Sequence, residues 1–144
     1  VYFFTDCQED NVTEFGETIN KISPDFVRIF NQSKLAEQNG YNEICGMGYR
    51  KSLEFLIKDY LCETQPENSE AIKKEPLSQS IKRISEKRIK TLAERCAWIG
   101  NDETHYTRKH EDYDINTLKV FINSVIHYIE AEFAFLSALE IQPK

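Results

Sequence analysis

Residues 114–139 restrict the fold more than any other part of the chain, because a helix wound from them is apolar around most of its circumference. Residues at helical spacing form a main stripe of Ile115, Leu118, Ile122, Val125, Ile126, Ile129, Phe133 and Leu136. Two lighter stripes contain Phe121, Tyr128 and Phe135, and Val120, His127, Ala131, Ala134 and Ala138. A helix of this kind either lies at the centre of a bundle or shares one face with a second protomer. We expect the second arrangement, a homodimer that forms through this C-terminal helix.

An earlier helix is predicted over residues 24–39, where the start and stop signals are clear. Ser23 offers a capping hydroxyl, Pro24 suits the first helical position, and Gly40 follows as a natural stop. The apolar spacing predicts one buried stripe along this helix, formed by Phe26, Ile29, Phe30 and Ser33.

A longer helix over residues 42–61 is expected to be central in the fold. Its apolar residues cover more than half of the helix circumference: Ile44, Tyr49, Leu53, Phe55, Leu56, Ile57 and Tyr60. Gly46 and Gly48 each cost this helix roughly 1 kcal/mol relative to Ala, so we expect them to admit the close approach of another helix. From residue 77 to 99, apolar spacings of three and four indicate two helices separated near Ser85.

Together these segments predict an all-α fold, a bundle of four to five helices in one domain. The helical domain is expected to span residues 23–144, after an irregular N-terminal segment at residues 1–22. Within that segment, residues 1–4 are either a short strand or an apolar strap over the bundle. Residues 64–76 are polar and contain two prolines, which predicts a loop.

The chain is acidic overall, with 18 Lys and Arg against 24 Asp and Glu and a net charge of −6. The molecule as a whole therefore does not attract nucleic acid or an anionic membrane, and either role requires a local basic patch. His127, Glu130 and Glu132 interrupt the most apolar segment, which argues against a transmembrane span. The four cysteines show no C-x-x-C spacing, so we expect free thiols in a reducing cytoplasm, no metal site and no cofactor.

A basic segment stands out against this acidic background. Between residues 81 and 95, six lysines and arginines accompany only two glutamates. This composition fits either a solvated helix face or a stripe that follows a nucleic-acid backbone. The candidate nucleic-acid contacts are Lys82, Arg83, Lys87, Arg88 and Lys90.

A polar cluster follows the basic segment directly, from Trp98 to His110. The imidazole of His105 can act as a base near neutral pH, an arginine can hold a phosphate through two hydrogen bonds, and Asn101 can orient either group. His105 and His110 are five residues apart and would point about 140° apart on a helix, which does not favour a shared metal ion.

Two strings of residues resemble a known family. They are G-M-G-Y-R-K-S-L-E-F-L-I-K-D-Y-L at residues 46–61 and W-I-G-N-D-E-T-H-Y at residues 98–106, and a closing apolar helix follows them. Together they resemble domain-of-unknown-function family 4145, a bacterial family that is similar to the HEPN superfamily. The resemblance implies a HEPN-like helical bundle that dimerises and works in a bacterial defence or stress system.

Active HEPN domains are metal-independent ribonucleases, and their motif is an arginine, a polar residue, three further residues and a histidine. By this resemblance Asn101 takes the polar position and His105 the histidine position, whereas Gly100 stands where the motif has its arginine. Hydrolysis would therefore need a guanidinium from elsewhere, for which Arg95, Arg108 and Arg50 are the candidates.

Three functions remain open at this point. The first is a HEPN-like dimer that binds RNA or a partner protein with little or no catalysis, and its site comprises Asn101, His105 and Arg108. The second is an endoribonuclease in which His105 is the general base or acid, with Arg95 or Arg108 holding the phosphate. The third is a purely structural oligomerisation or adaptor module.

Overall fold

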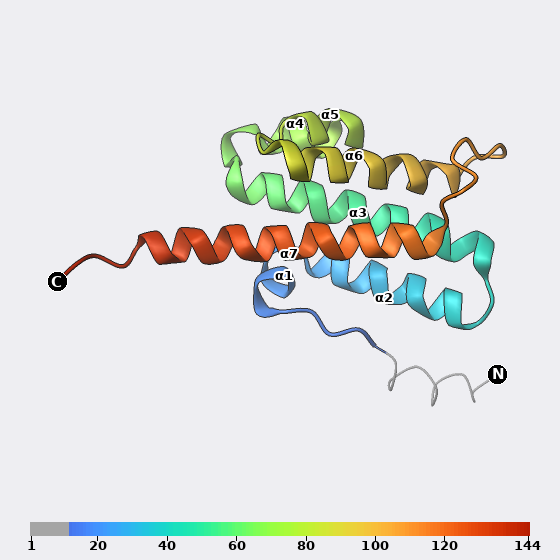
Figure 1. Cartoon of the computed structure of the whole chain (residues 1–144), viewed down its shortest axis with the longest axis horizontal. Coiled ribbons are helices and arrows are strands. Elements are labelled where there is room, and N and C mark those ends of the chain that lie inside the picture. The colour runs from blue at the N-terminus through green and yellow to red at the C-terminus, as the bar shows by residue number, and fades with distance from the viewer. Residues whose placement is uncertain (1–11) are drawn as a thin grey trace.

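The computed structural model describes residues 12–144, which fold into helices joined by short connections (Figure 1). The seven α-helices are α1 (Glu17–Ile22), α2 (Pro24–Gln38), α3 (Asn42–Thr64), α4 (Ser69–Lys74), α5 (Leu77–Lys82), α6 (Lys87–Asp102) and α7 (Ile115–Leu139). A 3-10 helix, η3, spans Pro66–Asn68. No strand occurs in this part of the chain, so the all-α prediction is confirmed. The strand or strap predicted at residues 1–4 lies outside the described residues.

The number of helices differs from the predicted four to five, because three of the seven are short. Helices α1, α4 and α5 each contain 6 residues. The end of the segment predicted to be irregular forms α1, and the loop predicted at residues 64–76 contains η3 and α4. Helices this short show too little apolar periodicity to be recognised in a sequence, and they are stabilised mainly by docking a single side chain such as Ile72, which is fully buried.

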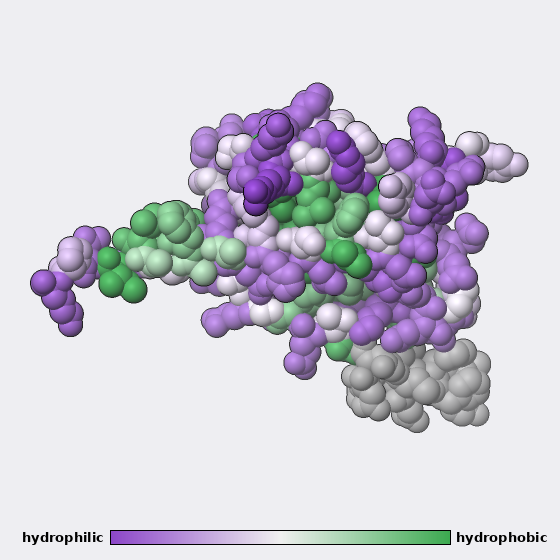
Figure 2. All heavy atoms as spheres, in the orientation of Figure 1, coloured by the Kyte–Doolittle hydropathy of each residue, from purple (hydrophilic) through white to green (hydrophobic). Residues whose placement is uncertain are grey.

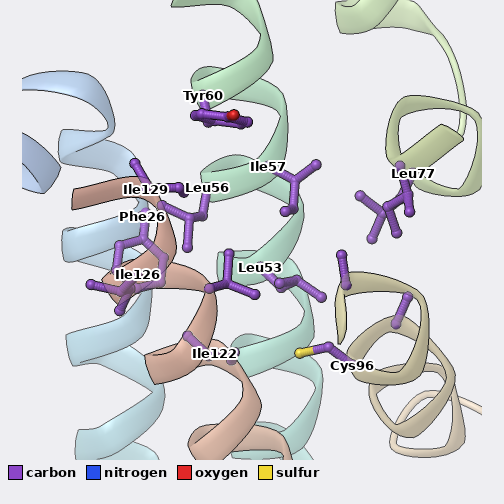
Figure 3. Packing of buried hydrophobic residues seen from close by; sticks show 14 of the residues in the cluster. Phe26, Leu53, Leu56, Ile57, Tyr60, Leu77, Cys96, Ile122, Ile126 and Ile129 are labelled. Atoms are coloured by element: carbon purple, nitrogen blue, oxygen red, sulfur yellow. The ribbon is translucent and has the colours of Figure 1, made fainter. Parts of the chain in front are cut away.

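Helix α3 is the central element, as predicted, and it contacts every other α-helix. It lies between α2 and α7 on one side and α5 and α6 on the other, and its side chains Leu53, Leu56 and Ile57 point into the core (Figure 3). Ile44 was expected in the same core but is 57% exposed. Apolar periodicity identifies a helix face without showing which part of that face another element covers, so the prediction failed at this first turn.

The hairpin of α2 and α3 is set by its termini and by one close approach. Ser23 caps α2 as predicted, accepting the N–H of Phe26 at 3.3 Å, and its hydroxyl also donates to Asp59 of α3 at 2.5 Å. Gly40 after the helix has a φ of 78°, which glycine adopts without strain. Within α3, a Cβ at Gly48 would collide with the Ser33 side chain of α2, so the expected close approach of a second helix is confirmed.

A polar cluster ties α2, α3 and α7 together at one end of the bundle. Lys119 of α7 donates to both carboxylate oxygens of Glu37 at 3.0 Å, and the hydroxyl of Tyr49 donates to the same carboxylate at 2.6 Å. Burial opposes ionisation of Glu37, but these hydrogen bonds and the lysine charge outweigh it and lower the pKa of Glu37. Burial, together with the same carboxylate, raises the pKa of Tyr49.

Helix α7 packs along only part of its length. Asp114 caps it by accepting the N–H groups of Asn116 and Thr117, and its buried residues run from Leu118 to Ile129. The C-terminal end projects beyond the other helices and carries exposed apolar side chains (Figures 1 and 2). Four of these are at least 44% exposed, namely Phe135, Leu136, Leu139 and Ile141. Across residues 12–144, no helix combines the length and apolarity needed to cross a membrane.

Three of the four cysteines fall within the described residues, and all three carry free thiols: Cys45, Cys62 and Cys96. Cys96 lies in the core between α6 and α7, and burial raises the pKa of its thiol. A thiol with a raised pKa is a poor nucleophile, which fits packing and not chemistry at this position.

Candidate functional site

Helix α6 carries most of the residues that the sequence singled out. The Glu86 side chain caps its start by accepting the N–H of Ile89 at 2.9 Å, and the helix continues to Asp102. Asn101 therefore lies on the last turn of α6, and His105 lies in the connection to α7, which spans residues 103–114. The sequence placed the end of this helix one turn too early, because Gly100 was taken as a stop.

An arginine from α3 lies directly over Gly100. The side chain of Arg50 crosses α6 there, and a Cβ on residue 100 would stand only 2.7 Å from the Arg50 Cγ. Beyond this crossing, Arg50 Nε donates to the Oδ1 of Asn101 at 3.1 Å, and Nη1 pairs with Glu54 at 2.8 Å. Gly100 is thus the residue that lets a guanidinium from a neighbouring helix reach Asn101.

Three adjoining surface hollows meet at Asn101, and we call them together the Asn101 groove. The first, of about 520 Å³, includes Met47, Arg50, Lys51, Phe55 and His105. The second, of about 590 Å³, includes Trp98, His105, Tyr106, Lys109 and His110. The third, of about 240 Å³, leads between α5 and α6 to Lys82 and Glu94. Asn101 therefore lies at the junction of a cationic hollow and an aromatic one.

His105 is exposed and stands at the boundary between two surfaces of opposite charge. It makes no hydrogen bond or ion pair with any residue in the range 12–144. On one side it lines the Asn101 groove. On the other side it lines a hollow of about 670 Å³ whose ionisable residues are mostly acidic, including Glu37, Glu43, Glu103 and Glu111. We call this second surface the acidic hollow.

Arg108, one of the predicted catalytic residues, belongs to the acidic hollow. Its guanidinium pairs with Glu103 at 3.0 Å and donates to the carbonyl of Tyr113 at 2.8 Å. Both contacts hold Arg108 against its own connection, away from Asn101. Of the three arginines considered from the sequence, Arg50 is the one bonded to Asn101.

Arg95, the other predicted catalytic arginine, packs on an aromatic side chain. Its guanidinium carbon lies 4.2 Å from the centre of the Trp98 ring. The imidazole of His110 stacks against the same indole, with ring centres 5.8 Å apart and an angle of 13° between the planes. Trp98 remains 43% exposed at the edge of the groove. The arrangement makes a rigid, cationic–aromatic wall for the second hollow.

The connection after α6 is organised by a residue that the sequence analysis did not single out. The buried carboxylate of Asp102 accepts the N–H groups of Lys109 at 3.0 Å and His110 at 2.8 Å, and it contacts the His110 ring at 3.0 Å. Burial opposes ionisation, but these hydrogen bonds outweigh it, so the pKa of Asp102 is lowered. A single sequence does not distinguish a buried carboxylate from the exposed ones around it, and this is why Asp102 was missed.

The predicted nucleic-acid contacts separate into free and occupied side chains. Lys82, Lys87 and Arg88 are exposed, and Lys82 lies in the Asn101 groove. Arg83 is occupied, since it binds both carboxylate oxygens of Glu75 at 2.6 and 3.1 Å. Lys90 is half-buried on the first turns of α6. Lys87 and Arg88 stand about 20 Å along the helix from Asn101, at a rise of about 1.5 Å per residue.

Within residues 12–144, no three or more His, Cys, Asp or Glu side chains are grouped so that they could hold a metal ion. The comparisons with known proteins find no relative: no family model matches the chain, and no curated protein and no solved structure matches it. The HEPN-like assignment therefore stays a prediction that depends on residues 46–61 and 98–106.

Proposed function

We propose that this protein is a HEPN-like dimer that binds single-stranded RNA in the Asn101 groove. The observation that carries the proposal is the placement of Arg50. Its Nε and Nη1 are engaged by Asn101 and Glu54, whereas its Nη2 makes no hydrogen bond with any residue from 12 to 144. A guanidinium held in place by two partners, with donors left over, is well suited to a phosphate.

Charge favours the Asn101 groove over the acidic hollow for a phosphate backbone. The groove contains the cations Arg50, Lys51, Lys82 and Lys109, whereas the acidic hollow has Arg108 as its single cation, already paired with Glu103. Because the chain carries a net charge of −6, RNA must be held locally by such cations against an overall repulsion. Exposed Lys87 and Arg88 extend the basic surface along α6.

Binding of a fluorescent single-stranded RNA, followed by anisotropy at several salt concentrations, tests the proposal. Arg50→Ala should weaken binding about tenfold or more, the loss expected for a hydrogen bond to a charged group. Replacing Lys87 and Arg88 together by Ala should reduce the slope of log K against log salt by about 2, one for each lost phosphate contact. Arg28→Ala is the matched control, because Arg28 forms an exposed pair with Asp25 on α2. Unchanged affinity in both test variants would contradict the proposal.

The dimer would form through the projecting end of α7. This end exposes Phe135, Leu136 and Leu139 without any covering element among residues 12–144, which is a costly surface for an isolated monomer. Ala134→Glu should therefore give a soluble monomer, measured by light scattering coupled to size exclusion. Ala71→Glu on exposed α4 is the control. A dimer that survives Ala134→Glu would show that another face pairs.

A ribonuclease is the second candidate, favoured by the position of His105. This side chain is open and lines the same hollow as Arg50 and Asn101. His105 could then take the proton of a ribose 2′-hydroxyl while Arg50 balances the charge that develops on the phosphate. His105→Ala should abolish cleavage and leave the fold and the dimer intact. A wild-type protein that leaves a pool of single-stranded RNAs uncut would contradict this candidate.

A protein-binding or purely structural adaptor remains the alternative to both RNA-based functions. It predicts that the dimer forms while no RNA binds at any salt concentration. The two assays above therefore separate the three functions without further variants.

A further inference from the structure

The orientation of the Asn101 amide is fixed by its neighbour. A guanidinium only donates hydrogen bonds, so the group that faces Arg50 Nε at 3.1 Å must be the amide oxygen of Asn101. The amide NH₂ group consequently points the other way. Arg50 in turn is held by Glu54, which leaves little freedom for either side chain.

The NH₂ group of Asn101 is accessible to a ligand. It donates to no residue between 12 and 144, and yet no buried side-chain nitrogen or oxygen in that range lacks a partner. The two facts together mean that this nitrogen is exposed to solvent. Since Asn101 borders all three hollows of the groove, the exposed donor faces the space where we place the RNA.

The two larger hollows differ in what they can hold. The one that contains Arg50 and Lys51 offers cations to a phosphate. The one that contains Trp98, His105 and His110 offers aromatic side chains and about 590 Å³, which suits a planar base. Asn101 lies between them, one side chain away from both a phosphate and its base.

We propose that Asn101 selects bases by donating its NH₂ group to an exocyclic carbonyl oxygen, so that uracil is preferred to adenine. This inference rests on RNA binding in the Asn101 groove. Asparagine recognises adenine by using its oxygen and its NH₂ group together, one accepting from the base amino group and the other donating to a ring nitrogen. Arg50 already occupies the oxygen here, so the adenine pairing is lost and a single donor remains. Uracil presents carbonyl oxygens to such a donor, whereas the exocyclic group of adenine is itself a donor.

The test compares the dissociation constants of decameric oligo(U) and oligo(A) RNA in wild type and two variants. Wild type should prefer oligo(U) by about 3- to 10-fold, the range expected for one net hydrogen bond. Asn101→Asp keeps the oxygen that Arg50 binds and removes the donor, so its overall affinity should fall and its preference should drop to within about twofold. Asn101→Ala should lose the preference as well. Dividing each variant's ratio by the wild-type ratio cancels the stacking of oligo(A) on itself.

The outcomes distinguish this inference from the proposed function. Wild-type protein that binds both oligomers equally, or an Asn101→Asp variant that keeps the full preference, overturns base selection by Asn101 and leaves RNA binding in place. Wild-type protein that binds neither oligomer overturns the proposed function itself.

Discussion

The contact of Arg50 with Gly100 makes a prediction in which the sign of a mutational effect reverses. In Gly100→Ala, the new Cβ would stand 2.7 Å from the Arg50 Cγ and 3.0 Å from its Cβ, well inside the roughly 3.5–4.0 Å of ordinary carbon contacts. Such overpacking costs about 1–3 kcal/mol, because α3 and α6 must move apart. Alanine also gains about 1 kcal/mol over glycine inside a helix. The net result is a loss of stability of about 1 kcal/mol.

Removing the arginine removes the cause. In an Arg50→Ala background the Cγ is absent, so Gly100→Ala should be close to neutral or should stabilise by up to about 1 kcal/mol. Urea unfolding of wild type, both single variants and the double variant, followed by circular dichroism, gives the coupling free energy directly. An equal cost of Gly100→Ala in both backgrounds, or stabilisation of the wild type, would refute the reasoning from the crossing.

Three further predictions test other parts of the molecule. Leu118→Ala should cost about 2–5 kcal/mol of unfolding free energy because Leu118 is fully buried, whereas Leu136→Ala on the projecting end of the same helix should cost less than about 0.5 kcal/mol in dilute protein. The lowered pKa of Glu37 stabilises the fold above its unfolded pKa, about 4.3, and this contribution is lost as the pH falls through the folded pKa. Glu37→Gln should therefore be less stable at pH 6 but lose less on going from pH 6 to pH 3.5, as measured by urea unfolding; an unchanged difference would contradict the assignment. Asp102→Asn should cost about 1–3 kcal/mol and make residues 103–114 more sensitive to protease, because its amide cannot accept all three hydrogen bonds.

The sequence predicted the four long helices because their signals are local. Ser23 and Pro24 mark the start of α2, the apolar spacing of α3 and α7 repeats over many turns, and the break near Ser85 separates α5 from α6. The short helices α1 and α4 were not predicted, since the docking of one side chain such as Ile72 leaves no periodic pattern. The exposure of Ile44 could not be predicted either, because it depends on where the neighbouring helices end.

The candidate site shows the same limit more sharply. His105 and Asn101 stood out as polar residues after a basic helix, and their exposure at a groove is consistent with that interpretation. The contact between Arg50 and Asn101 joins residues 51 positions apart, and no local pattern states which of several arginines crosses α6. The glycine was the available signal. A glycine near the end of an otherwise regular helix can mark a side chain arriving from another element as well as a stop.

The projecting end of α7 has a consequence for how the helix moves. Beyond Ala134 its backbone hydrogen bonds are covered by no other element of the described chain, and a helical stretch this short is marginal in water without packing. These turns should open and close rapidly, so their amide hydrogens should exchange with deuterium far faster than those between Leu118 and Ile129, which open only with the core. Any surface that covers the end would slow this exchange. The last turns of α7 thus serve as an intrinsic reporter of association, readable in the unmodified protein.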